Sequence, residues 1–265
     1  MRDLKALMDM TGRRVLITGG AGHLGRTMGD SLAELGAEVI LVDMPTAQTQ
    51  SVADGIKKRW GGIVTALDCD LESSKAREEL AKRITPDGLS VLVNNAAFVG
   101  TSGLDGWAAP FTDQSVETWR RALEVNLTAT FHLSQLLSHA LMNGPSGCII
   151  NIGSIYGLCA PDYGLYEDTS MANPAAYAAS KGGIVQLTRW LSTTLAPQVR
   201  ANVISPGGIA RGQPSSFVER YRKRTPLNRM GVEEDFRGAI AYLASDASAY
   251  VTGQVLCVDG GWCVW

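Results

Sequence analysis

The sequence predicts a doubly wound α/β fold of the Rossmann kind, a seven-stranded parallel sheet with helices on both faces. Short β-branched runs alternate with longer stretches of helical periodicity along the 265 residues. The short runs are apolar without alternation, as in strands buried on both faces. No linker rich in Pro, Gly or Ser interrupts this rhythm, so we expect a single domain over residues 1–265.

The elements follow one another in a strand–helix order. The expected strands cover residues 15–18, 38–42, 63–67, 90–94, 148–152, 200–204 and 255–258. The expected helices lie near residues 23–35, 46–59, 72–84, 115–142, 175–195 and 233–245. Residues 158–173 and 207–216 fit neither pattern, and long irregular segments within a compact domain are often functional.

Composition excludes several classes of partner. With 24 Lys and Arg against 26 Asp and Glu, the net charge is −2, so we expect no nucleic-acid or membrane partner. The five cysteines form no C-x-x-C pair, which argues against a disulfide framework or a zinc site and favours a reducing cytoplasm. Charged residues interrupt the amino terminus, so no export signal or membrane span is expected.

A glycine-rich turn follows the first expected strand. Residues 18–25 read T-G-G-A-G-H-L-G and open the first helix. Glycines allow the backbone to approach a pyrophosphate, which the helix N-terminal amides then bind. The residues expected to contact the dinucleotide here are Gly19, Gly22, His23, Leu24 and Gly25.

An acidic residue follows at the expected distance. Asp43 ends the second strand about 20 residues on, where a carboxylate accepts the ribose hydroxyls of an adenosine. Its charge would repel a 2′-phosphate, and Gly22 and Met44 stand where a basic residue could have met that phosphate. We therefore expect NAD to be preferred over NADP, with Arg26 as the nearest basic exception.

Two further strand ends carry candidate cofactor contacts. Asp70 and Leu71 follow the third strand, where the carboxylate could accept from the adenine amino group. Asn94 and Ala96 follow the fourth, where they could lie along the cofactor. The alternatives are a helix N-cap at Asp70 and an ordinary strand-end turn at Asn94.

A tyrosine and a lysine are spaced for acid/base chemistry. Tyr177 and Lys181 lie four residues apart and therefore share one helix face. A cation close to a phenol favours the phenolate and lowers its pKa, so the pair could exchange a proton as a carbonyl and an alcohol interconvert. A solvated helix face is the alternative.

Taken together, these motifs resemble the short-chain dehydrogenase/reductase family, in its compact single-domain branch, over residues 12–262. The resemblance lies in Thr18-Gly19 with its glycines, Asp70, Asn94-Asn95-Ala96, Asn126, Ser154, Tyr177 with Lys181, Pro206-Gly207 and Asp259-Gly260-Gly261. It implies an NAD(P)-dependent oxidoreductase that transfers a hydride between the cofactor and a secondary alcohol or carbonyl.

The resemblance also implies roles for these residues. Tyr177 would be the general acid/base, and Ser154 would hold and polarise the substrate oxygen. Lys181 would lower the pKa of Tyr177 and hold the nicotinamide ribose. Asn126 would kink its helix and position a water that connects Lys181 to solvent.

Further expectations follow from the same resemblance. The backbone of Pro206, Gly207 and Ile209 would bind the nicotinamide carboxamide. A homodimer or homotetramer would form through the helices that hold Asn126 and Tyr177, and no metal is expected.

The sequence departs from the family pattern in three places. His23 stands where the compact branch has glycine, and it either touches the phosphate or simply starts the helix. Ser154 and Tyr177 are 23 positions apart, a longer spacing than is common, and the extra residues fall in 158–173. The threonine that usually follows Pro-Gly and touches the carboxamide is missing from residues 206–212.

Substrate identity rests on the inserted segment, residues 158–173. Together with residues 206–209 (P-G-G-I) and 213–216 (Q-P-S-S), this segment resembles a subgroup in surface-sugar and flagellin-modification pathways, which implies a sugar or sugar derivative. Its side chains suited to sugar stacking and hydroxyl binding are Tyr163, Tyr166, Glu167 and Asp168. A solvent-exposed loop or subunit contact is the alternative role of the segment.

Other functions remain open at this point. A 3-oxoacyl thioester or a simple alcohol could be the substrate, as in much of the family. A long-branch epimerase or dehydratase shares the glycine spacing. A non-catalytic NAD-binding scaffold or sensor is the alternative of another class.

Several conspicuous residues have ordinary explanations. His132 and His139 share a helix but lack further ligands, which favours packing or surface roles over a metal. The basic run at 220–224 meets either an anionic substrate group or solvent. Trp262 and Trp265 are expected to pack rather than to bind a ligand.

Overall fold

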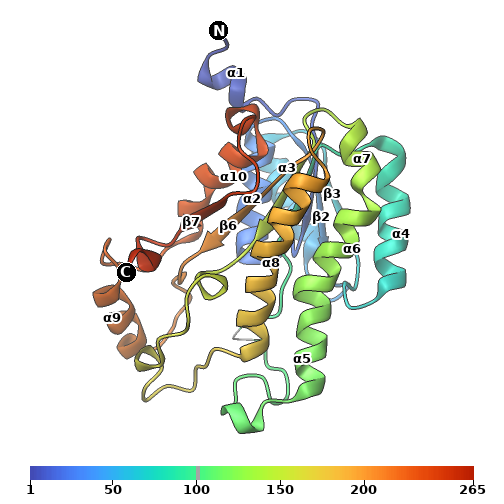
Figure 1. Cartoon of the computed structure of the whole chain (residues 1–265). Helices are drawn as coiled ribbons and strands as arrows, with labels where there is room; N and C mark the ends of the chain where they lie inside the picture. The colour runs from blue at the N-terminus through green and yellow to red at the C-terminus, as the bar shows by residue number, and fades with distance from the viewer. Residues whose placement is uncertain (100–101) are drawn as a thin grey trace.

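The computed structural model describes residues 1–99 and 102–265 and contains a seven-stranded parallel sheet (Figure 1). The strand order is β3-β2-β1-β4-β5-β6-β7. The strands are β1 (Arg14–Thr18), β2 (Glu38–Asp43), β3 (Val64–Asp68), β4 (Val91–Asn94), β5 (Cys148–Ile152), β6 (Arg200–Pro206) and β7 (Val255–Val258). The predicted fold class is confirmed, and the order reverses between β1 and β4, where such sheets bind ligands beyond the carboxyl ends of their strands.

Helices cover both faces of the sheet. They are α1 (Leu4–Met8), α2 (His23–Glu34), α3 (Thr49–Trp60), α4 (Ser74–Ile84), α5 (Val116–Leu123), α6 (Ala129–Leu136), α7 (Ser138–Asn143), α8 (Ala175–Thr194), α9 (Ser215–Arg224) and α10 (Arg237–Ala244). Successive residues of a strand point to opposite faces of the sheet. Val15 and Ile17 of β1 pack with α2, α3 and α10 on one face, whereas Leu16 packs with α4, α6 and α8 on the other. Two apolar layers thus enclose the sheet.

The structure differs from the expected helices in the region of residues 115–142 and at helix α9. The single helix expected over 115–142 is divided into α5, a π-helical turn at Glu124–Thr128, α6 and α7. Helix α9 was not expected, and its capping residue Pro214 belongs to the segment that was interpreted as irregular. Phe217 and Tyr221 of α9 are buried and lie four positions apart. A single pair at this spacing gives too little helical periodicity to be recognised beside the Gly- and Pro-rich residues that precede the helix.

A third apolar cluster lies outside the two layers. It joins the inserted segment, helix α9 and the carboxy-terminal turn, which lie together at the lower left of Figure 1. Its buried members are Ile155, Leu165, Phe217, Tyr221, Met230 and Trp262, and we call this group the aromatic cluster. The cluster gives residues 158–173 a hydrophobic anchor.

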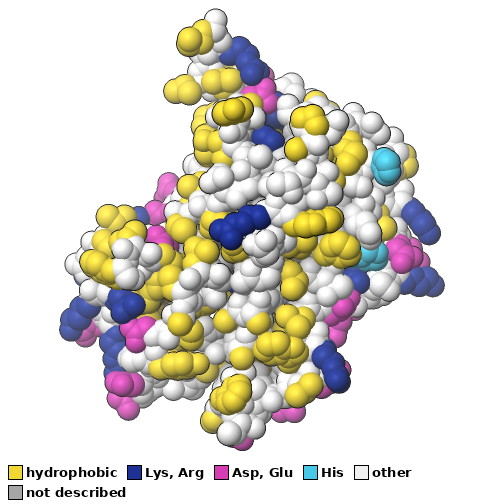
Figure 2. All heavy atoms as spheres, viewed as in Figure 1, with side chains coloured by type: hydrophobic (Ala, Val, Ile, Leu, Met, Phe, Trp, Pro, Cys, Tyr) yellow, Lys and Arg dark blue, Asp and Glu magenta, His cyan; other side chains and the backbone are white. Residues whose placement is uncertain are grey.

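One surface of the molecule exposes large apolar side chains. Helices α5, α6 and α8 contribute to the face in Figure 2, on which yellow side chains form several patches. Exposed members on these helices are Val116, Trp119, Phe131 and Trp190. No helix among the described residues has the length and apolarity needed to cross a membrane.

Candidate active site

The glycine turn leaves no room for side chains. Gly19 has a φ of +64°, and a Cβ there would lie 2.8 Å from Asn95 Nδ2. A Cβ on Gly25 would lie 2.0 Å from the carbonyl oxygen of Gly19, so only glycine lets helix α2 start this close to the turn. Gly22 caps α2 without a side-chain hydrogen bond, which leaves the amides at this helix end facing the turn for an anion to bind.

Asp43 is held beside this turn by backbone amides. Its Oδ2 accepts from Ala21 N at 2.9 Å, and its Oδ1 accepts from Met44 N at 2.8 Å. Each carboxylate oxygen retains capacity for another hydrogen. The glycine turn, the uncapped helix end and the oriented carboxylate fit the pyrophosphate and ribose of a nicotinamide dinucleotide.

Asp70 follows β3 but is not the helix N-cap of the alternative interpretation, since Ser73 caps α4. Asp70 Oδ1 accepts from Glu72 N at 2.9 Å, which is a local turn contact. Leu71 is buried at 8% exposure and packs in the layer below α4. Asp70 is half-buried and Leu71 is largely covered, so Asp70 is the more accessible of the two to an adenine ring.

Asn94 ends β4, and its expected place along the cofactor stays a prediction. Its side chain points into the sheet, where Nδ2 donates to Asn151 Oδ1 at 2.9 Å and the residue is 5% exposed. Ala96 N donates to Thr18 Oγ1 at 3.1 Å, which ties the residues after β4 to the end of β1. Asn94 therefore links strands, and a cofactor could meet this strand end only through its backbone.

Ser154, Tyr177 and Lys181 come together as expected. Ser154 follows β5 in an extended conformation, while Tyr177 and Lys181 lie on α8. Ser154 lies close enough to the Tyr177 phenol to lower its pKa, and Lys181 Nζ lies 5.7 Å from the centre of the Tyr177 ring. The turn after Ser154 packs on α8 so tightly that a Cβ on Gly157 would lie 2.6 Å from the Lys181 carbonyl oxygen.

Burial is the main influence on the pKa values of Tyr177 and Lys181. Burial raises the pKa of Tyr177, and the hydrogen bond with Ser154 and the charge of Arg211 oppose that rise. The Lys181 ammonium donates to the Ile152 carbonyl at 2.7 Å, and its expected lowering of the pKa of Tyr177 stays a prediction. Burial lowers the pKa of Lys181 to about 8, which leaves it mostly protonated at neutral pH.

Asn126 lies within the π-helical turn between α5 and α6. Its Oδ1 accepts from Phe98 N at 2.7 Å, and its Nδ2 donates to Phe98 O at 3.1 Å and Ser180 Oγ at 3.2 Å. The helix is interrupted here as the resemblance implies. The side chain joins the chain after β4 to α8, and the expected role of Asn126 in positioning a water stays a prediction.

The glycines after β6 fit a crowded site. Pro206 ends β6, and a Cβ on Gly207 would lie 2.8 Å from Asp259 Cα. Gly208 N donates to the Tyr221 hydroxyl, and a Cβ on Gly208 would lie 2.7 Å from the Tyr221 ring. Helix α9 thus packs directly on this turn.

Residues beyond this turn carry contacts that sequence reasoning missed. Arg211 Nε donates to Glu233 Oε1 at 3.1 Å, and His23 Nδ1 lies 3.6 Å from the same oxygen. His23 is the first residue of α2, and its side chain is largely exposed. Ile209 O accepts from Gln213 Nε2 at 2.7 Å. The missing threonine was the only signal in the sequence that this turn would differ.

The inserted segment packs against α9 rather than standing free. Leu165 is 2% exposed within the aromatic cluster, and the rings of Tyr166 and Phe217 are 5.5 Å apart. The hydroxyls of Tyr156 and Tyr166 are hydrogen-bonded to each other. Tyr163 remains 65% exposed.

The basic run on α9 is bound to the inserted segment. Arg220 donates to the carbonyls of Leu165 and Glu167 and lies 3.8 Å from the exposed Asp168 carboxylate. Arg224 pairs with Asp162 at 3.2 Å. These guanidinium groups thus hold the inserted segment. This role differs from both alternatives expected for residues 220–224, which were contact with an anionic substrate group and exposure to solvent.

Another residue that the sequence did not indicate is Asn173. It is 5% exposed, and neither of its side-chain polar atoms has a hydrogen-bond partner among the described residues. It lies four residues before Tyr177, next to the Pro174 cap of α8. A buried amide without partners has unused hydrogen-bonding capacity for a polar ligand.

His132 and Trp262 have the expected packing roles, whereas Trp265 is exposed. His132 Nδ1 accepts from Arg77 Nε at 3.1 Å, and Trp262 stacks on Tyr221 with ring centres 4.4 Å apart. Trp265 is 72% exposed. Among residues 1–99 and 102–265, no three His, Cys, Asp or Glu side chains gather as metal ligands.

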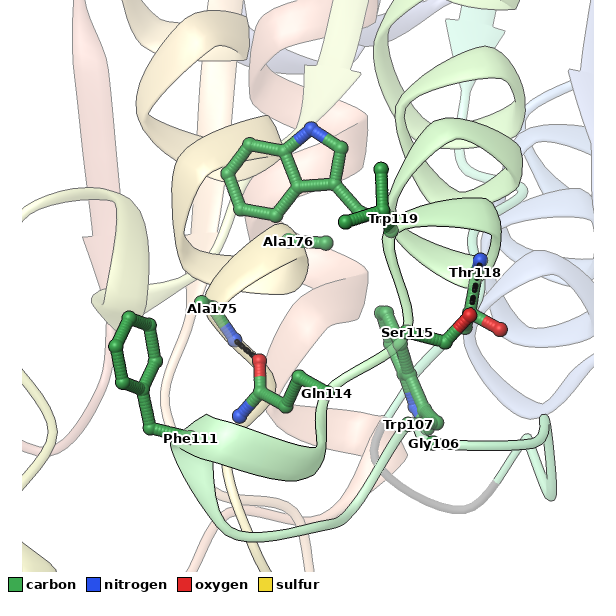
Figure 3. A pocket seen from close by; sticks show the side chains of 10 residues that line it. Gly106, Trp107, Phe111, Gln114, Ser115, Thr118, Trp119, Ala175 and Ala176 are labelled. Atoms are coloured by element: carbon green, nitrogen blue, oxygen red, sulfur yellow. Dashed lines mark hydrogen bonds between the residues drawn. The ribbon is translucent and has the colours of Figure 1, made fainter.

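A cavity of about 330 Å³ lies beside the amino-terminal end of α8 (Figure 3). Trp107, Phe111 and Trp119 surround it, and Gln114 Oε1 accepts from Ala175 N at 3.1 Å. Gln114 thereby caps α8 two residues before Tyr177, which helps to fix where the phenol lies.

Comparison with known proteins shows similarity over almost the whole chain. A family model described as enoyl-(acyl carrier protein) reductase matches residues 19–263. A galactitol 2-dehydrogenase (L-tagatose-forming) of Cereibacter sphaeroides is 31% identical, over 99% of this chain and 100% of that protein. A 3-oxoacyl-[acyl-carrier-protein] reductase of Aquifex aeolicus is 29% identical, over 96% and 98%.

A solved structure is similar in fold as well. The gluconate 5-dehydrogenase of Burkholderia cenocepacia, in complex with NADP and tartrate, has a TM-score of 0.86 and 27% identity. The match covers 99% of this chain and 100% of that one.

Proposed function

Because this chain belongs to the short-chain dehydrogenase/reductase family and is an NAD(P)-dependent oxidoreductase of CH–OH groups, we propose that it interconverts a secondary alcohol and a carbonyl on a sugar or sugar derivative. The observation that carries the proposal is the grouping of Ser154, Tyr177 and Lys181 at the carboxyl end of the sheet. The match over 19–263 also supports a single domain.

In the proposed mechanism the chain supplies orientation and a proton. The nicotinamide cofactor donates or accepts the hydride. The Ser154 hydroxyl holds the substrate oxygen, and the Tyr177 phenol gives it a proton during reduction. Since burial raises the pKa of Tyr177, the phenol is fully protonated at neutral pH and suited to that donation. Lys181, above the same ring, binds the ribose and favours the phenolate when the reaction runs toward oxidation.

The cofactor is proposed to be NAD rather than NADP. Asp43 is oriented toward the glycine turn by Ala21 N and Met44 N, and its charge disfavours a 2′-phosphate there. The gluconate 5-dehydrogenase structure contains NADP, so the preference varies within the family and has to be measured for this chain.

The sugar substrate is supported by relatives and by the site. Relatives act on galactitol and gluconate, as their names state. In this chain the inserted segment and α9 share the aromatic cluster after Ser154. Asn173 offers an amide that has no hydrogen-bond partner within residues 1–99 and 102–265 and could bind a hydroxyl. The alternative substrate, a 3-oxoacyl thioester, is supported by the similarity to the Aquifex aeolicus reductase.

A substrate panel tests the proposal. The protein is incubated with NAD and polyols, sugar acids or simple alcohols, and with NADH and a 3-oxoacyl thioester, while absorbance at the reduced-cofactor band is followed. We expect the highest kcat/KM on a polyol or sugar acid. Higher kcat/KM on the thioester would favour the alternative, and no turnover of any compound would favour a non-catalytic role.

We also propose a homodimer or homotetramer formed through the helix face in Figure 2. Val116, Trp119, Phe131 and Trp190 are exposed on α5, α6 and α8, and such a group of apolar side chains is typical of a subunit interface. Light scattering gives the mass in solution. Trp190→Glu is expected to shift it toward the monomer, whereas a wild-type protein of monomer mass would contradict the proposal.

A further inference from the structure

Two cysteines that are far apart in the sequence meet beside the aromatic cluster. The sulfurs of Cys159 and Cys263 are 2.9 Å apart, although the residues are 104 positions apart. Both side chains are half-buried, so a small molecule can reach them. Cys69 and Cys148 are buried, and Cys257 is exposed on β7. All five cysteines are free thiols.

The backbone holds both thiols in place. Cys159 N donates to Ile155 O at 2.8 Å in the turn that follows Ser154. Cys263 N donates to Asp259 Oδ2 at 3.0 Å in the carboxy-terminal turn. An S–S bond is about 2.05 Å long, so the sulfurs need to approach by about 0.9 Å, which side-chain rotation can supply.

We propose that Cys159 and Cys263 are an oxidisable pair, which hydrogen peroxide converts into a disulfide between the inserted segment and the end of the chain. Pairs with this behaviour in reducing compartments are usually transient and redox-sensing. The proposal is independent of which substrate the active site takes.

The oxidation balances with one peroxide. Burial, the neighbouring Cys159 and the Asp259 carboxylate raise the pKa of Cys263, which makes Cys263 a poor first nucleophile. The Cys159 sulfur therefore attacks peroxide oxygen, the O–O bond breaks, and the Cys159 sulfenic acid and one water form. The Cys263 sulfur then attacks the Cys159 sulfur, the S–O bond breaks, and its proton leaves with the hydroxide as a second water. Two thiols are oxidised and one peroxide is reduced.

The disulfide would form beside the aromatic cluster, on the substrate side of the active site. Cys159 lies five residues after Ser154, and Cys263 is adjacent to Trp262, which stacks on Tyr221 of α9. Oxidation would join the inserted segment covalently to the turn that supports α9. Because the glycine turn and Asp43 lie elsewhere, we expect the KM for substrate to change and the Kd for NADH to stay within about twofold.

Peptide mapping under non-reducing conditions tests the pair directly. Reduced protein is treated with hydrogen peroxide, remaining thiols are alkylated, and trypsin then releases peptides 122–181 and 238–265. We expect these two peptides to be linked with the loss of two hydrogen atoms. Because they also contain Cys148 and Cys257, Cys257→Ser is the matched control and should keep the link. Cys159→Ser and Cys263→Ser should each abolish it.

Thermal unfolding supplies the second measurement. A disulfide between Cys159 and Cys263 closes a loop of 104 positions. Its formation should raise the Tm by about 5 °C or more, both in the wild type and in Cys257→Ser. Reduction with dithiothreitol should reverse the rise. Separate peptides after peroxide, or a link that persists in Cys263→Ser, would overturn the proposal. Unchanged Tm despite a link would overturn the claim that the bond constrains the inserted segment.

Discussion

The two sides of the active site are built from contacts of different range. On the nucleotide side, Asp43 is held by Ala21 and Met44, which are 22 and 1 positions away. On the substrate side, Arg220 binds the Glu167 carbonyl from 53 positions away, and Cys159 meets Cys263 from 104. The comparison teaches that the nucleotide side can be read from short motifs, whereas the substrate side depends on how distant segments pack.

Because of this difference, we expect mutations on the nucleotide side and on the substrate side to have different effects. Substitutions on the nucleotide side should change cofactor binding without disturbing distant elements. Substitutions on the substrate side should change stability and substrate recognition together, since the inserted segment, α9 and the carboxy-terminal turn share one apolar cluster. The following predictions test that separation.

The largest effect is expected at the junction of the two sides. Tyr177→Phe removes only the hydroxyl, so turnover should fall about 10²-fold or more while NADH affinity and Tm stay near wild type. Tyr166→Phe is the matched control, because it removes a buried hydroxyl that bonds Tyr156 and not the substrate oxygen. Steady-state kinetics and fluorescence titration measure both variants. Wild-type turnover in Tyr177→Phe would contradict the proposed role.

Shortening the inserted segment should damage the substrate side alone. When residues 161–171 are replaced by a Gly/Ser connector, the aromatic cluster loses Leu165 and the Tyr166 ring that packs against it. The free energy of unfolding should therefore fall by about 2–5 kcal/mol. We expect kcat/KM on the best polyol or sugar acid to fall about tenfold or more. The Kd for NADH should be unchanged, and a large rise in that Kd would show that the two sides are not separable.

Asp43 should control cofactor choice on the nucleotide side. Asp43→Ala removes the charge that repels a 2′-phosphate, so the preference for NADH over NADPH should narrow about tenfold. Fluorescence titration of both cofactors measures the ratio, and Asp70→Ala serves as an acidic control at the neighbouring strand end. Equal or tighter NADPH binding by the wild type would refute the preference itself.

The smallest effect concerns the protonation of Lys181. Because burial lowers its pKa to about 8, the side chain carries its charge below that pH and loses it above. If only the ammonium form binds the ribose well, NADH affinity of the free enzyme should fall by up to about fourfold between pH 7 and pH 8.5. Lys181→Arg should abolish this dependence, since arginine stays charged throughout. A pH-independent Kd in the wild type would contradict the assignment.

Much of the fold and of the candidate site could be predicted because the relevant signals are local. The apolar runs predicted the parallel strands, and the spacing of Tyr177 and Lys181 predicted a shared helix face. Asn94 illustrates the limit, because a strand-end amide looks the same in sequence whether it faces a ligand or, as here, Asn151 of the next strand. The burial that raises the pKa of Tyr177 is likewise not visible in a four-residue spacing.

By itself the sequence determined the seven strands, the glycine turn, the placement of Asp43 after β2 and the family to which the chain belongs. These features depend on periodicity and on residues that act within one turn or one strand end. Only the tertiary structure decided the strand order, the packing of residues 158–173 on α9 and the meeting of Cys159 with Cys263. The physical reason is that such contacts depend on burying apolar surface shared by segments far apart in the chain, and no local pattern specifies which distant segment supplies the other half.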